Sequence, residues 1–174
     1  RRHSGNTTNH VKKSHQAEID VLSQYSLPIL KRAIFARRLP SSRNLADYVS
    51  VLFRLGHWDE GFRDLMRAPQ TMHSEEIDFY LGIYFLYVGN YLRAEEQFAR
   101  VLGKNPKNGA ALNNLGAIRL LAHDLERADA YFTEALRWNT GYLDAAHNKK
   151  LIESRNEINA SVVKLTWREL RPNL

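Results

Sequence analysis

The sequence predicts an all-α fold built from tandem helix-turn-helix repeats. One phrase occurs twice, as "FYLGIYFLYVGNYLRAEEQFARVL" in residues 79–102 and as "NNLGAIRLLAHDLERADAYFTEAL" in residues 113–136, at an interval of 34 residues. Each copy holds two segments with apolar residues at helical spacing, and a short break separates them. A fixed period of this length is typical of stacked helix pairs. We therefore expect helices throughout and no sheet.

Each repeated phrase predicts one helix pair. In residues 113–136 the break is "AHD", and Asp124 is well placed to cap the second helix. Gly116 and Ala128 stand twelve residues apart, which predicts that the two helices approach closely where both side chains are small. In residues 79–102, Gly82 and Ala94 repeat this spacing, and Pro106 then ends the second helix. Ser74 followed by two glutamates predicts the start of the first helix of that pair. We expect phenylalanines 98 and 132 to fill the space between one pair and the next.

These residues carry a family resemblance. Leu81-Gly82, Ala94, Phe98 and Pro106, and again Leu115-Gly116, Ala128 and Phe132, resemble the tetratricopeptide repeat (TPR) signature. The sequence departs from the signature at Asp78 and Leu112 in place of Trp, at Phe85 and Arg119 in place of Tyr, and at Thr140 in place of a second Pro. The resemblance implies a solenoid whose first helices line a concave surface, where a partner's extended peptide or helix is held.

Weaker copies extend the array in both directions. Residues 41–140 are predicted to form three TPR-like repeats, the first of them carrying Val49 and Gly61 where the later copies carry Gly and Ala. Residues 141–159 resemble a first helix only, which predicts a solvating capping helix. Residues 14–40 predict N-terminal helices, split near Ser26 and Pro28, that could make a further degenerate repeat. Residues 160–174 form a tail that either extends the cap or docks separately.

Composition and charge narrow the function classes. The length of 174 residues suits one domain, and the absence of Cys excludes disulfides, thiol catalysis and thiolate metal sites. Residues 1–40 hold eight Lys or Arg against two acids, whereas residues 41–174 hold 17 of each sign. Residues 1–13 are polar and have no helical period, and we therefore expect them to form a disordered basic arm. The arm is either a solvated end or an attachment to an acidic partner or an anionic membrane surface, and nucleic acid is unlikely to be its partner because no aromatic residues interleave it.

The compartment is not fixed by the sequence. No apolar run reaches the ~20 residues of a membrane span, and no signal-peptide pattern is visible. The chain begins at Arg1 rather than Met, which suggests a fragment. The cytoplasm is favoured, with a periplasmic protein or a membrane-tethered fragment left open.

Helical spacing from the packing positions selects the side chains of the expected concave face. They are Asp47, Ser50, Arg54, Phe79, Tyr80, Ile83, Tyr87, Asn113, Asn114, Ala117, His147, Asn148 and Leu151. Phe79, Tyr80 and Tyr87 suggest an aromatic patch that would anchor an apolar group, unless they pack against a neighbouring helix.

Asn114 and Asn148 are in register, one in each repeat. An Asn amide both donates and accepts, so it can pair with a peptide backbone of any sequence, although Asn is also common on exposed helix faces. The family resemblance adds that many TPR peptide binders, and the O-linked N-acetylglucosamine transferase superhelix, have Asn at this position. We expect a two-rung ladder ~8–10 Å apart that contacts one strand at points about three residues apart. We also expect that neither amide takes part in packing.

Two further functions are disfavoured. The carboxylate clamp of chaperone-binding TPR domains needs Lys near the asparagines, but Asp144 and Ala110 occupy those places. No Gly-rich phosphate loop and no HExxH motif occur, and the seven His are scattered, so we expect no enzyme, no catalytic residue, no metal and no cofactor. The predicted function is a protein–protein interaction scaffold that binds a partner peptide or helix in its groove within a larger complex. The alternative is a self-assembling homo-oligomer.

Overall fold

The computed structural model describes residues 16–154 and 158–168, and within these ranges it contains helices and turns but no strand. The predicted all-α fold is thus confirmed. The basic arm, residues 1–13, lies outside the described residues. None of the described helices combines the length and apolar character that a bilayer crossing requires. The chain divides into two compact units, Arg1–Ala68 and Pro69–Leu174, instead of the one domain expected from its length. The predicted three-repeat segment 41–140 crosses this boundary.

Unit 1 contains the N-terminal helices and the first repeat. Residues 16–22 are helical, and the chain turns before α2 (Leu27–Phe35), α3 (Ser41–Arg54) and α4 (Trp58–Met66). Helix α3 packs against both α2 and α4. Several basic side chains are paired with acids inside this unit. Lys31 lies 2.9 Å from Asp64, and Arg54 pairs with Glu18.

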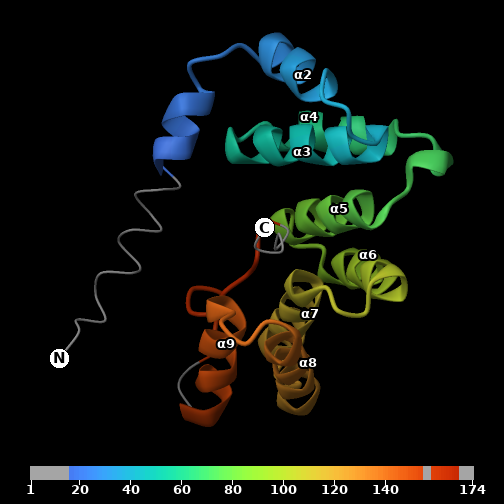
Figure 1. Ribbon diagram of the computed structural model, residues 1–174. Coiled ribbons are helices and arrows are strands. Elements are labelled where there is room, and N and C mark those ends of the chain that lie inside the picture. Colours follow the sequence, from blue (N-terminus) through green and yellow to red (C-terminus); the bar gives the residue numbers. More distant parts are fainter. Residues whose placement is uncertain (1–15, 155–157, 169–174) are drawn as a thin grey trace. The chain divides into compact units, whose positions relative to one another are not determined.

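Unit 2 begins with a 3₁₀ turn (η1, Gln70–Met72) and continues with five helices (Figure 1). They are α5 (Glu75–Tyr87), α6 (Tyr91–Lys104), α7 (Gly109–Leu121), α8 (Leu125–Trp138) and α9 (Leu143–Ser154). Helix α5 packs with α6, α7 with α8, and α9 against α8 and α7. Thus two complete helix pairs and one additional helix stack in this unit.

Polar side chains start the helices of unit 2. The oxygen of Asp124 accepts a hydrogen bond from the Arg127 amide at 3.3 Å, which confirms the predicted cap of α8. Ser74, Asn90 and Asn108 cap α5, α6 and α7 in the same way. Inside each pair the chain turns through a residue in the left-handed region. This residue is Gly56 (φ 82°), Gly89 (φ 74°) and, one repeat later, His123 (φ 60°).

The small residues of the repeat make room for a phenylalanine ring. A Cβ atom on Gly116 would lie 2.6 Å from Cε1 of Phe132, and one on Gly82 would lie 2.7 Å from Cε1 of Phe98. Each ring therefore lies over the glycine of its own helix pair, and the prediction that it fills the space between pairs is wrong. In the first repeat the arrangement is reversed, because the ring lies on the first helix: a Cβ atom on Gly61 of α4 would lie 2.6 Å from Cε1 of Phe53 of α3.

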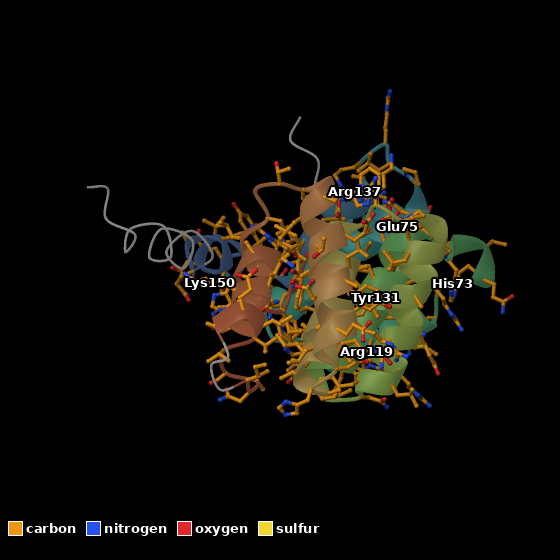
Figure 2. The ribbon with its side chains drawn as sticks, turned by 90° about the horizontal axis from the view of Figure 1, so that it is seen from below. His73, Glu75, Arg119, Tyr131, Arg137 and Lys150 are labelled. Atoms are coloured by element: carbon orange, nitrogen blue, oxygen red, sulfur yellow. The ribbon has the colours of Figure 1, made fainter. Side chains whose placement is uncertain are left out.

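Polar contacts join successive pairs of unit 2. Glu75 at the start of α5 accepts hydrogen bonds from Asn105 at 2.9 Å and Asn108 at 2.6 Å, both in the connection between α6 and α7. Arg119 of α7 lies 2.5 Å from Glu95 of α6. Glu75 and Arg119 are labelled in Figure 2. These contacts join the α5–α6 pair to the α7–α8 pair.

The capping helix is shorter than predicted. Helix α9 spans Leu143–Ser154, and residues 158 and 159 are not helical, whereas the sequence predicts a helix to residue 159. The oxygen of Asn159 accepts hydrogen bonds from the amide of Ser161 at 2.9 Å and from its hydroxyl at 2.6 Å. Asn side chains that bond to nearby backbone in this way favour a turn over a helix. Residues 158–168, called the tail segment below, continue without regular secondary structure.

Candidate functional site

Three asparagines of unit 2 form the centre of a candidate site. Asn113 and Asn114 lie on α7, and Asn148 lies on α9. All three side chains are fully buried, and they hold the tail segment by hydrogen bonds. The expectation that Asn114 and Asn148 take no part in packing is therefore wrong, because residues of the same chain cover both side chains.

Two of the asparagines bracket the backbone of the tail segment. Asn148 accepts a hydrogen bond from the amide of Lys164 at 2.7 Å and donates to its carbonyl oxygen at 2.8 Å. Asn114 binds Thr166 in the same way, accepting from its amide at 2.8 Å and donating to its carbonyl oxygen at 2.9 Å. The side chain of Lys164 is exposed and takes no part in the bracket.

The rungs meet the tail two residues apart, not about three as expected. In an extended chain, alternate residues point their polar backbone groups in the same direction, so residues i and i+2 can face one helix layer together. Asn114 of the earlier helix holds Thr166, and Asn148 of the later helix holds Lys164. The tail segment therefore runs in the direction opposite to the order of the repeats.

Asn113 connects the two rungs. Its amide donates to the Lys164 carbonyl oxygen and to the Thr166 hydroxyl, both at 3.0 Å. Its oxygen accepts from Asn148 at 3.0 Å. Every amide hydrogen of Asn113 and Asn148 is thus used, and both side chains are held in one orientation.

The hydroxyl of Thr166 occupies a polar pocket of its own. It donates to a carboxylate oxygen of Asp144 at 3.1 Å, and it is bonded to the Tyr142 hydroxyl and to the Asn113 amide. Burial raises the pKa of the Tyr142 phenol above its ordinary value near 10. The phenol therefore stays protonated at neutral pH and can donate a hydrogen bond.

An apolar contact lies beside this pocket. Val163 is buried in a cluster that includes Ala117, Leu151 and the ring of Tyr142. His147 lies 2.8 Å through its Nε2 atom from the Val162 carbonyl oxygen. The site thus combines backbone hydrogen bonds, one apolar contact and one hydroxyl pocket.

Six of the predicted groove residues are brought together around the tail segment, namely Asn113, Asn114, Ala117, His147, Asn148 and Leu151. The sequence reasoning missed Tyr142 and, on the tail, Thr166. Asp144 was considered only as the absence of a lysine, although its helical spacing from Asn148 was the signal that could have placed it in the groove.

The predicted aromatic patch does not exist as an exposed surface. Phe79 is fully buried, with its ring centroid 5.7 Å from that of Phe98 across the α5–α6 pair. Tyr80 and Ile83 are also buried, whereas Tyr87 is half-exposed. Packing against a neighbouring helix, the other reading of these aromatics, describes Phe79.

The predicted groove residues of unit 1 pair with its other side chains. Asp47 lies 2.8 Å from Arg37, and Arg54 donates to the Ser50 hydroxyl at 3.3 Å while it also pairs with Glu18. Asp47 and Ser50 are mostly buried.

The described residues contain no group of three or more His, Cys, Asp or Glu arranged to hold a metal ion. No protein-family model and no curated protein matches the sequence. Among solved structures, the chain is similar to the C-terminal TPR-containing domain of a Plasmodium falciparum protein described as an FK506-binding protein. The TM-score is 0.55 at 15% identity, and the match covers 77% of this chain and 95% of that domain. The fold is thus a TPR-type helical repeat.

Proposed function

We propose that unit 2 is a protein-interaction module that holds an extended partner peptide by its backbone. In this proposal the partner takes the place of the tail segment along α7 and α9. The supporting observation is the pair of brackets at Asn114 and Asn148, which make four hydrogen bonds to the amides and carbonyl oxygens of residues 164 and 166. Because these bonds use no side chain of the held segment, the same asparagines suit a segment from another protein.

The amide pairs would contribute part of the free energy of such binding. Each hydrogen bond contributes about 0.5–1.5 kcal/mol net, so the four together contribute about 2–6 kcal/mol. The apolar contact at Val163 adds about 1–2 kcal/mol if its side chain is buried on binding. These terms also hold the tail segment in place, so a partner must displace it.

The test opens the groove without changing its walls. Lys164→Pro removes the amide hydrogen that Asn148 accepts, and Lys164→Ala is the matched control because it keeps this hydrogen and changes only an exposed side chain. A fluorescent peptide of residues 158–168 is titrated against both full-length variants. We expect the Lys164→Pro chain to bind the peptide at least about tenfold more tightly than the control. Equal weak binding by both chains would contradict the proposal.

A second comparison identifies the binding surface. Asn114→Ala and Asn148→Ala are added together to the Lys164→Pro chain. Loss of the four backbone bonds should weaken peptide binding by about 30-fold or more. Circular dichroism melting curves check that the helices remain folded. Unchanged affinity would place the peptide elsewhere on the chain.

Self-assembly is the second candidate function, because each copy of the chain carries a segment that fits its own groove. Exchange of tail segments between two copies would produce a dimer with the same hydrogen bonds. Sedimentation across a concentration series tests this candidate. A single monomeric species at all concentrations would exclude it.

A further inference from the structure

We propose that the groove selects a segment with a threonine at the position held by Asn114, through a pocket built for one hydroxyl group. This inference rests on the proposed function, since it names the kind of peptide that the same groove takes. The pocket consists of Tyr142, Asp144 and Asn113, and in this structure it holds the hydroxyl of Thr166.

The hydroxyl uses its full hydrogen-bonding capacity in this pocket. A threonine hydroxyl has one hydrogen to donate and two lone pairs that accept. The hydrogen is donated to the Asp144 carboxylate at 3.1 Å, because a carboxylate only accepts. The Asn113 amide at 3.0 Å and the protonated phenol of Tyr142 then fill the two acceptor positions. Thr166 is 4% exposed, so water does not replace these partners easily.

Other side chains at this position leave groups unpaired. Valine has the shape of threonine but would leave the Tyr142 hydroxyl, one Asn113 hydrogen and an Asp144 oxygen without their partner. Sites built to bond a hydroxyl reject the analogue that lacks it much more strongly than apolar pockets reject an extra methyl group. Serine keeps the hydroxyl and loses only a methyl group. Phosphothreonine would place its negative charge beside the Asp144 carboxylate, which is unfavourable.

A second preference follows from the position three residues earlier. Val163 enters the apolar cluster with Ala117 and Leu151, while Lys164 between the two contacts points its side chain outward. The selected segment therefore has an apolar residue, then one residue whose side chain is free, then one that packs partly against the cluster as Leu165 does, and then threonine. The threonine is the more stringent of the two requirements, because its rejection of substitutes depends on buried polar groups.

The experiment uses the full-length Lys164→Pro chain and four peptides of residues 158–168. The peptides carry Thr, Ser, Val or phosphothreonine at position 166 and are otherwise identical. We expect the Thr peptide to bind about 30-fold or more tightly than the Val peptide, the Ser peptide to lie within about tenfold of Thr, and the phosphorylated peptide to bind weakly. If the Lys164→Pro chain does not fold, the full-length Thr166→Val chain serves as the acceptor, since its own tail lacks the hydroxyl.

A variant of the pocket makes the test specific. Tyr142→Phe keeps the ring in the apolar cluster and removes only the phenol oxygen, so the preference for Thr over Val should fall about tenfold. Equal binding of the Thr and Val peptides would overturn this inference and leave the proposed function standing. Failure of every peptide to bind would overturn both. A preference for Thr that Tyr142→Phe leaves unchanged would also overturn the inference, because it would show that the hydroxyl is selected elsewhere.

Discussion

Gly116→Ala tests whether a phenylalanine ring occupies the space that the glycine leaves open. The added Cβ atom would lie 2.6, 2.8 and 3.0 Å from three atoms of the Phe132 ring. Carbon atoms in contact prefer about 3.5–4.0 Å, so the ring would have to move by about 1 Å. Phe132 is fully buried, and protein interiors are packed as densely as organic crystals. Overpacking of this kind costs about 1–3 kcal/mol.

The helix propensity of alanine opposes this cost and must be measured separately. Alanine is favoured over glycine inside a helix by up to about 1 kcal/mol, so the substitution has a gain as well as a penalty. Gly103→Ala is the matched control, because Gly103 also lies in a helix and its added Cβ atom would meet nothing within 4 Å. We expect Gly103→Ala to be neutral or stabilising and Gly116→Ala to be less stable than it by about 1–3 kcal/mol.

The assay is urea unfolding followed by circular dichroism on both variants and the unmodified chain. Gly116→Leu should be worse than Gly116→Ala, because more atoms enter the same space. Phe132→Leu, added to Gly116→Ala, should recover part of the loss by relieving the contact. Equal stabilisation by the two alanine substitutions, or additive effects of Gly116→Ala and Phe132→Leu, would show that the ring does not lie over the glycine.

Three further outcomes are expected. His123→Gly should raise the free energy of unfolding by about 1 kcal/mol, because a left-handed φ of 60° costs a non-glycine residue about 1 kcal/mol. A melting temperature below that of the unmodified chain would contradict this prediction. Lys104→Met should lower the free energy of unfolding in urea by about 1–3 kcal/mol, because the buried Asp78 would lose the lysine at 2.5 Å and keep only His73 at 3.9 Å. Lys104→Arg should cost less, and equal costs would show that the charge is unimportant. Because the pKa of Tyr142 is raised in the folded state, the unfolded state loses the phenol proton at lower pH, and the free energy of unfolding should fall as the pH rises above about 10. Tyr142→Phe should make that fall smaller in a series of unfolding curves measured at different pH.

The helices and their caps could be predicted because their signals are local. Asp124 precedes an apolar-periodic segment, and its side chain caps the helix that follows. The repeat at 34 residues likewise predicted which glycines lie at close contacts. The sequence placed Phe98 and Phe132 between successive helix pairs, whereas each ring lies within its own pair. Spacing along the chain identifies the face of a helix, but it does not identify the adjacent helix that this face contacts.

The occupant of the groove could not be predicted in the same way. Asn114 and Thr166 are 52 residues apart in sequence, and the tail segment has no helical period that would place it. Register alone identified Asn114 and Asn148 as amides able to bind an extended backbone. It carried no information on whether that backbone belongs to this chain, and the pocket at Tyr142 becomes visible only when Thr166 is seen within it.

The tail segment belongs to the same molecule as the groove it covers, and this connection gives it an effective concentration. A segment joined by a short connection is present at about millimolar concentration near its site, whatever the concentration of the protein. A free peptide with the same contacts would therefore displace it by half only at about that concentration. A partner present at micromolar levels needs roughly a thousandfold higher intrinsic affinity, about 4 kcal/mol, from contacts beyond those of residues 158–168. The covalent connection from α9 thus sets an affinity threshold, and shortening or lengthening it would move that threshold without changing a single contact in the groove.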